Sequence, residues 1–231
     1  MTQFMFMAGA GEHLDDRQLG YKFMRPLLCG KDSTSFVRYG NSIGPVNNTP
    51  QADWGLSLLA AVDNGKRELI RAIRETTHVP WIVAYSLGAY AATTFLEEKA
   101  QGFHMDLQIG GAILIGNPRA YRRVNRQGIA GAHGRFPSIP VVEVCNYHDL
   151  ICSTPLNSIM TKLPNAVSAL TGDHLDGNAL HKWFLDMLVR QTALPTMEDV
   201  RMLSGYANGT SHQSDYLENP EFRRQVARVL P

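Results

Sequence analysis

A serine at position 86 stands where an apolar run ends and a helical pattern begins. The segment Ala84–Gly88 reads AYSLG, with a small residue two places before the serine and two places after it. Small residues there let a strand and the following helix approach closely around a sharp turn, which exposes the serine hydroxyl at the carboxyl end of a sheet. Glycine is usual at the first place, and Ala84 adds only a methyl group. The pattern predicts that Ser86 is a nucleophile; the alternative is a serine that only caps the helix.

A nucleophilic serine needs a base and an acid that orients the base. In hydrolases with this turn the acid follows a later strand and the histidine comes last. Asp149 follows the β-branched run Ile139–Val144 by a short turn, so we expect it at the same sheet edge as Ser86. A turn aspartate without a role in catalysis is the alternative. Asp173 and Asp176 are rival acids, but no strand precedes them.

Three histidines follow the acid, and His212 is the expected base. It lies in a polar loop just before the last helical pattern, which is where this arrangement delivers its base. His174, in a Gly-Asp loop, is the runner-up, and His181 fits a packing or surface position in a helix. The other histidines stand before the acid or beside it: His13, His78, His104, His133 and His148.

Acyl transfer also needs N–H donors for the oxyanion that forms on the attacked carbonyl. The backbone N–H of Leu87, directly after the serine, is the expected first donor. We expect the second in the loop Gly9–Glu12, where glycines let the backbone approach the substrate. The competing interpretation is a phosphate-binding Gly-x-Gly-x-x-Gly loop, but Leu14 stands at the third glycine position and no Gly-Lys-Ser/Thr follows.

Strand and helix patterns alternate in the part of the chain that carries these residues. Apolar or β-branched runs predict buried strands at Phe4–Ala8, Trp81–Tyr85, Ile109–Ile115 and Ile139–Val144. Helical spacing predicts helices at Asp53–Glu75, interrupted at Gly65, and at Leu87–Ala100. Runs that are apolar on both faces suit a parallel sheet covered on both sides. The sequence therefore predicts an α/β fold with a mostly parallel sheet.

The pattern changes after Asp149. The stretch 155–205 holds no convincing strand, and Asp176 could cap a helix within it, so we expect a helical insertion inside one domain that spans residues 1–231. Three further segments complete the prediction: a surface loop at Tyr39–Gln51, a turn-rich break at Gly205–Thr210 and a closing helix at Pro220–Leu230.

The composition excludes several classes of protein. With 231 residues, of which 44% are hydrophobic and 19% charged, the chain can bury a large core and is not globally disordered. A formal net charge of +1 gives no reason to expect nucleic acid as a partner. No apolar run is long enough for a membrane span, and the N-terminus lacks the basic region of a secretory signal. Three cysteines without a Cys-x-x-Cys pair exclude a disulfide-built scaffold.

Four short motifs, taken in order, resemble the cutinase-like serine esterases and most closely the lysin B family, the mycolylarabinogalactan esterases of phages that infect mycobacteria and related actinobacteria. The motifs are YSLGA at 85–89, GNPR at 116–119, CNYHDLIC at 145–152 and SHQSDY at 211–216; RQGIAG at 126–131 is also similar to lysin B. The resemblance implies an α/β-hydrolase three-layer sandwich with a helical insertion, matching 155–205, before the histidine.

The resemblance also implies a role for each site residue. By position it makes Ser86 the nucleophile, Asp149 the acid, His212 the base, and the backbones of Ala10 and Leu87 the oxyanion donors. Leu87 replaces the glutamine common after the serine in cutinases, which removes a side chain but keeps the backbone donor. No metal or other cofactor is implied.

Cys145 and Cys152 bracket Asp149 at the spacing of a cutinase disulfide, so the resemblance makes a bridge there possible; two reduced thiols are the equal alternative. Four arginines could contact an anionic envelope polymer, although the default expectation is that they form a solvated face. They are Arg119, Arg122, Arg123 and Arg126. Apolar residues that could form an acyl-binding wall or lid, or only pack on the core, are Leu163, Val167, Leu170 and Trp183.

The family's reaction is hydrolysis of the ester that joins mycolic acids to arabinogalactan, through an acyl-enzyme. The expected partner is therefore a lipid ester of the mycobacterial-type cell envelope, and the expected state is a monomer. Without a signal peptide, the protein would stay in the host cytoplasm until lysis and then act on the envelope. One alternative is a general cutinase-like lipase or carboxylesterase; another is a non-catalytic envelope-binding module that kept the hydrolase fold.

Overall fold

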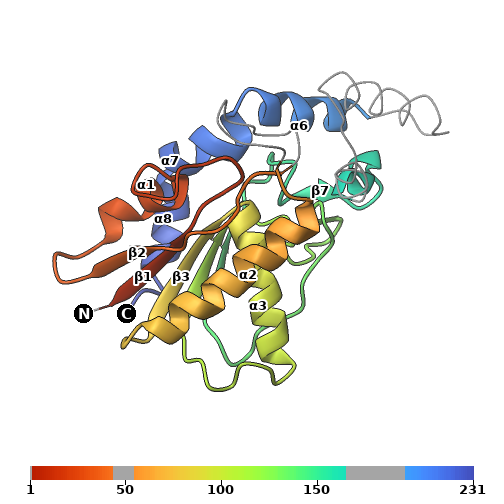
Figure 1. Cartoon of the computed structure of the whole chain (residues 1–231). Helices are drawn as coiled ribbons and strands as arrows, with labels where there is room; N and C mark the ends of the chain where they lie inside the picture. The colour runs from red at the N-terminus through yellow and green to blue at the C-terminus, as the bar shows by residue number, and fades with distance from the viewer. Residues whose placement is uncertain (1, 44–54, 165–195) are drawn as a thin grey trace.

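The computed structural model describes residues 2–43, 55–164 and 196–231. At its centre lies a sheet of five parallel strands in the order β2-β1-β3-β4-β6 (Figure 1). The strands are β1 (Gln3–Met7), β2 (Ser33–Phe36), β3 (Pro80–Tyr85), β4 (Gly111–Ile115) and β6 (Val141–Val144). Because the carboxyl ends of parallel strands share one sheet edge, the segments that follow these strands meet there.

The four predicted strands are confirmed as β1, β3, β4 and β6, and their apolar runs are buried. The prediction lacks β2, whose sequence STSF is mostly polar and only partly buried. This strand pairs with β1 alone, at the edge of the sheet. An edge strand keeps one side in contact with solvent, so its residues need not be apolar.

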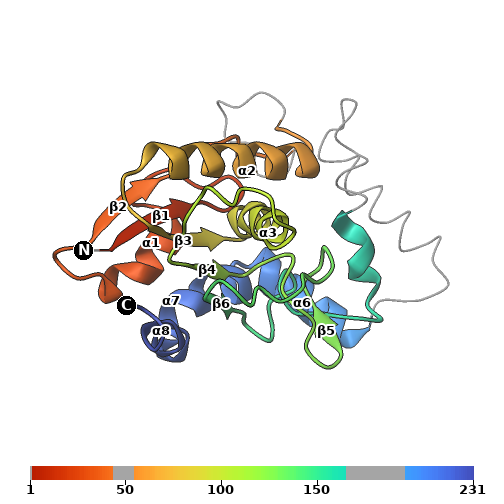
Figure 2. The same cartoon turned by 90° about the horizontal axis from the view of Figure 1, so that it is seen from below.

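Helices cover both faces of the sheet (Figures 1 and 2). One face carries α2 (Leu58–Glu75) and α3 (Leu87–Ala100), and the other carries α1 (Leu19–Met24), α7 (Asp215–Glu218) and α8 (Pro220–Ala227). Alternate residues of a strand point to opposite faces. In β1, Met5 and Met7 join the core beneath α2 and α3, whereas Phe4 and Phe6 join the core beneath α1 and α8. The predicted three-layer α/β sandwich is confirmed.

Helix α2 is continuous through Gly65, so the predicted interruption is wrong. A Cβ atom at Gly65 would lie 3.0 Å from the Cβ of Ala91 in α3 and 3.1 Å from the ring of Tyr39. The glycine therefore serves close packing between α2 and α3 rather than a break. Tyr39 itself is buried, so the predicted surface loop does not begin there.

The other described elements lie outside the five-stranded sheet and the helices that cover its faces. They are the 3-10 turns at Arg25–Leu27 (η1) and Ile159–Lys162 (η2), the short antiparallel pair β5 (Arg126–Gln127) and β7 (Thr154–Pro155), α6 (Met197–Ala207) and the π-helical turn η3 (Thr210–Ser214). The break predicted at Gly205–Thr210 begins later than expected, because α6 continues to Ala207 and the chain turns at Gly209, which has φ 69°.

Several predictions fall outside the described residues. These are the helix after Asp176, the rival acids Asp173 and Asp176, the histidines His174 and His181, and the apolar residues Val167, Leu170 and Trp183. Among the described helices, none is long and apolar enough to cross a membrane.

Candidate active site

Ser86 occupies the turn between β3 and α3 with φ 51° and ψ −115°. A residue with a side chain rarely adopts a positive φ, and holding it there costs about 1–3 kcal/mol. The Ser86 N–H donates to the carbonyl of Ile115 at 2.9 Å, which fixes the turn to the end of β4. The hydroxyl makes no capping hydrogen bond to α3. The local geometry is the sharp strand-to-helix turn that the sequence predicts.

Gly88 lets β1 approach the start of α3. Its N–H donates to the carbonyl of Ala8 at 3.1 Å, and a Cβ atom at this position would lie 2.6 Å from that oxygen and 2.7 Å from the carbonyl of Met7. Only glycine fits between these backbone atoms. Ala84, at the other small position, is fully buried in the core beneath α2 and α3, so the fold accommodates its methyl group.

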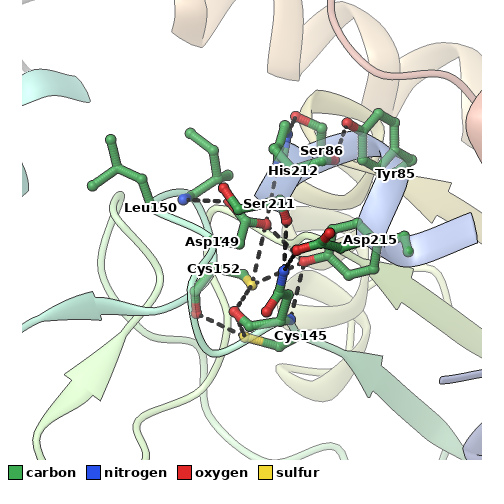
Figure 3. Close-up of polar contacts among 12 residues, drawn as sticks. Tyr85, Ser86, Cys145, Asp149, Leu150, Cys152, Ser211, His212 and Asp215 are labelled. Atoms are coloured by element: carbon green, nitrogen blue, oxygen red, sulfur yellow. Dashed lines mark hydrogen bonds and ion pairs between the residues drawn. The ribbon is translucent and has the colours of Figure 1, made fainter. Parts of the chain in front are cut away.

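His212 links the serine to the carboxylate (Figure 3). Its Nε2 lies 2.9 Å from the Oγ of Ser86, and its Nδ1 lies 2.8 Å from the Oδ2 of Asp149. With the imidazole proton on Nδ1, His212 donates to Asp149 and accepts from the serine hydroxyl. The structure thus brings together the three side chains that the sequence singled out. The three come from three different segments that follow β3, β6 and α6.

Asp149 is completely buried and each of its oxygens accepts at least one hydrogen bond. Oδ1 accepts from the N–H of Ile151 at 2.9 Å. Oδ2 accepts from His212 and also from the hydroxyl of Tyr216 at 2.7 Å, and the thiol of Cys152 lies 3.4 Å away. These donors fix the position of the carboxyl group, and a carboxylate held in this place can orient an imidazole and stabilise an imidazolium.

Three groups around His212 fix its ring and backbone. Tyr85, the residue before the serine, donates its hydroxyl to the carbonyl of His212 at 2.6 Å, and the two rings lie 5.0 Å apart between centroids. Burial raises the pKa of the Tyr85 phenol, so the hydroxyl remains a donor. Gly116 has φ 56°, and a Cβ atom there would lie 3.0 Å from the Cε1 of His212. The ring of Tyr206 also lies near the imidazole of His212, with 5.4 Å between the two ring centroids.

The expected oxyanion donors lie beside this chain of hydrogen bonds. Ala10 belongs to the loop after β1, which contacts the start of α3 through the Gly88–Ala8 hydrogen bond. Leu87 is the first residue of α3, where the helix dipole favours negative charge. Within the described ranges, neither the N–H of Ala10 nor that of Leu87 has a hydrogen-bond acceptor.

Cys145 and Cys152 are both free thiols in the structure. The thiol of Cys145 donates to the carbonyl of Cys152 at 3.2 Å (Figure 3). Burial raises the pKa of the Cys152 thiol, which keeps it protonated beside Asp149.

The four arginines of the 119–126 segment do not form one free cationic cluster. Arg119 pairs with Glu97 at 2.7 Å, and Arg126 is buried, pairs with Glu198 and lies 3.9 Å from the centre of the Tyr147 ring. The described parts of the chain contain no group of three His, Cys, Asp or Glu side chains that could hold a metal ion.

No protein-family profile and no curated protein sequence matches this chain. Solved structures do match it. The catalytic core of acetyl xylan esterase from Trichoderma reesei superimposes with a TM-score of 0.53 at 16% identity, over 74% of this chain and 94% of that one. A cutinase-like protein from Cryptococcus sp. gives 0.50 at 18% identity, over 74% and 91%. Lysin B from Mycobacteriophage D29 gives 0.54 at 13% identity, over 96% and 98%.

The chain has the fold of the cutinase-like α/β-hydrolases. At these low sequence identities, the similarity shows a shared fold and nothing more. The three matches differ in extent: lysin B covers 96% of this chain, and each of the other two structures covers 74%.

Proposed function

We propose that the protein is a serine ester hydrolase in which Ser86, His212 and Asp149 form the catalytic triad. The observation that carries this proposal is the continuous chain of hydrogen bonds from the Ser86 hydroxyl through the His212 imidazole to the buried Asp149 carboxylate. Nucleophile, base and orienting acid are the parts that acyl transfer through serine requires.

The reaction proceeds in two steps. The Oγ of Ser86 attacks the ester carbonyl while Nε2 of His212 takes the hydroxyl proton, and the resulting imidazolium is stabilised by Asp149. His212 then gives the proton to the departing alcohol, which leaves an acyl-serine. Water, deprotonated by His212, attacks this acyl group, and the carboxylic acid departs as the proton returns to Ser86. The N–H groups of Ala10 and Leu87 donate to the oxyanion in both steps.

Labelling with a fluorophosphonate tests the triad. We expect one covalent adduct, on Ser86, and hydrolysis of a p-nitrophenyl ester that falls at least ~10³-fold in Ser86→Ala and in His212→Ala. Ser138→Ala, which changes an exposed serine, is the matched control and keeps full activity. An unlabelled and inactive wild-type protein that still binds cell envelopes would favour the non-catalytic module instead.

For the substrate, we propose the ester between mycolic acid and arabinogalactan in the actinobacterial envelope. Of the three structures reported above, lysin B matches the largest share of this chain, 96% against 74% for the acetyl xylan esterase core. The insertion predicted at 155–205 would then serve as a wall for a long acyl chain, in a single domain of residues 1–231. The enzyme would act as a monomer, held in the host cytoplasm until lysis releases it to the envelope.

A comparison of substrates distinguishes this proposal from a general cutinase-like lipase or carboxylesterase. The wild-type protein is given purified mycolyl-arabinogalactan, and p-nitrophenyl esters of increasing chain length in parallel. We expect release of free mycolic acid, lost in Ser86→Ala. Efficient hydrolysis of short esters with no release of mycolic acid would reject the mycolyl ester as substrate and leave the general esterase.

A further inference from the structure

The loop that carries Ala10 is held by hydrogen bonds to several of its backbone N–H and C=O groups. The carbonyl of Ala8 accepts from the N–H of Gly88 at 3.1 Å and from the hydroxyl of Tyr39. The first of these bonds joins the loop to the helix that starts after Ser86. The loop therefore has a fixed position relative to the serine before any substrate arrives.

Glu12 folds back over the loop and uses both of its carboxylate oxygens. Oε2 accepts from the N–H of Gly9 at 2.7 Å, and Oε1 accepts from the N–H of Leu19, at the start of α1, at 2.8 Å. The carboxylate thus connects the loop to α1 and fixes the Ala8–Gly9 peptide plane, which is next to the plane that carries the N–H of Ala10. A hydrogen bond between a backbone N–H and a carboxylate is among the stronger ones in proteins.

Asn41 holds the other side of the same loop. Its side-chain Nδ2 donates to the carbonyls of Gly9 and Glu12, both at 2.9 Å, and its own carbonyl accepts from the N–H of Gly11 at 2.8 Å. The N–H of Glu12 donates to the carbonyl of Gly9 at 3.3 Å. Among the N–H groups from Gly9 to Glu12, that of Ala10 alone finds no acceptor in the described part of the chain.

Glu12 is also close to the triad. Burial raises the pKa of its carboxyl, and the nearby His212, when charged, acts in the opposite direction. Gly9 lies directly against Tyr85, whose ring a Cβ atom would approach to 2.7 Å. Tyr85 in turn donates to the backbone of His212. The Glu12 carboxylate therefore binds a loop residue that packs against Tyr85, and Tyr85 binds the backbone of the base.

We propose that Glu12 and Asn41 are positioning residues that hold the N–H of Ala10 toward the substrate oxyanion. The inference rests on the proposed function, since an oxyanion forms only if Ser86 attacks a carbonyl. Neither side chain would touch the substrate. Their effect would be on the transition state, where the oxyanion carries charge, and not on binding of the neutral ester.

Glu12→Gln tests this, because the amide keeps one acceptor oxygen and places an NH₂ group against a second N–H donor. We expect kcat for a p-nitrophenyl ester to fall ~10- to 100-fold while KM stays within about 3-fold, since loss of one oxyanion donor costs ~10²–10³. Binding of a trifluoromethyl ketone, whose tetrahedral adduct carries the oxyanion, should weaken by the same factor as kcat/KM.

Asp15→Asn is the matched control, because its carboxylate lies in the same stretch but binds Arg17 instead of the loop backbone around Ala10, and it should leave both constants unchanged. Asn41→Ala is the second variant, should Glu12→Gln not fold, and we expect the same loss in kcat. A folded Glu12→Gln or Asn41→Ala with kcat within about 3-fold of wild type, or with the loss confined to KM, would overturn the inference. A wild-type protein that neither reacts with the fluorophosphonate nor hydrolyses esters would instead overturn the proposed function.

Discussion

The Oδ2 atom of Asp149 is where several donors meet. The imidazole of His212 and the hydroxyl of Tyr216 both bind it, at 2.8 and 2.7 Å. The same hydroxyl accepts from the N–H of Asn146 at 3.1 Å, so Tyr216 joins the acid-bearing loop to the segment of the base. Tyr216 is completely buried. One phenol therefore serves both the charge distribution of the triad and the packing beneath it.

Tyr216→Phe separates these two contributions, because the ring remains and only the hydroxyl is lost. The N–H of Asn146 loses its acceptor, so we expect the free energy of unfolding to fall by ~1–3 kcal/mol. Loss of one donor to Asp149 should lower kcat/KM ~3- to 10-fold, far less than removal of His212. Urea denaturation and ester hydrolysis measure the two effects. Tyr121→Phe, on the surface, is the control, and equal behaviour of the two variants would contradict this assignment.

Sequence patterns could predict Ser86, Asp149 and His212 because each has a position relative to a strand or helix that the chain itself reveals. Tyr216 and Glu12 could not be predicted in the same way. They act through a shared oxygen and through backbone N–H groups, and such contacts depend on three-dimensional proximity. A signal for Tyr216 does exist in retrospect, since it follows His212 by one helical turn and faces the same side.

At the scale of elements, the contact between β1 and the start of α3 determines where the serine points. It depends on the absence of a side chain at Gly88, where a Cβ atom would meet two backbone oxygens at 2.6 and 2.7 Å. Backbone atoms in a central strand cannot move away as a flexible side chain can.

Gly88→Ala should therefore destabilise the fold by ~1–3 kcal/mol, the usual cost of overpacking, although alanine favours helices. It should also reduce ester hydrolysis, because the turn at Ser86 and the loop of Ala10 are pushed apart. Gly134→Ala is a matched control, since a Cβ atom there meets nothing within 4 Å. Thermal unfolding of both variants decides the matter; a Gly88→Ala protein as stable and active as wild type would refute the steric argument.

Elements with a clear apolar periodicity could be predicted from the sequence. Features that depend on the position of a neighbouring element in the fold could not. Helix α3 has the predicted bounds, and β1, β3, β4 and β6 match within a few residues. Strand β2 is polar because it lies at an edge, and Gly65 is small because α3 lies against it. A glycine in the sequence can mark a turn or a close helix crossing, and only the packing in the structure distinguishes the two.

At the scale of the whole molecule, a buried polar network connects α3, the segment between β4 and β6, and β6 itself. Glu143 in β6 accepts from the amide of Asn117 at 2.8 Å and contacts Nε2 of His133 at 3.0 Å. Asn117 also donates to Thr93 in α3 at 2.9 Å. The network therefore ties the long excursion between β4 and β6 to the sheet and to α3. Burial lowers the pKa of His133, but its bond to Glu143 outweighs that effect and the pKa is raised.

A raised pKa in the folded state means that His133 stabilises the fold when it is protonated. That contribution is fully present below the unfolded pKa, ~6.5, and is lost as the pH rises through the higher folded pKa. We therefore expect the stability difference between wild type and His133→Gln to be largest near pH ~6 and to shrink by pH ~9. Urea denaturation at both pH values measures it. A difference that stays constant with pH would show that folding does not raise the pKa of His133.

The distance along the chain between Ser86 and His212, 126 positions, has a consequence for biosynthesis. A ribosome makes β1, β3 and the serine turn before it makes the imidazole. The stretch that carries His212 also supplies Tyr216 and Val226, which cover the apolar face of Tyr85, Ile115 and Val144. A nascent chain that stops before this stretch would thus be inert and incompletely covered. Catalytic competence and a covered core arrive together, so the hydrolase that we propose stays silent until the stretch from His212 to Val226 has been made.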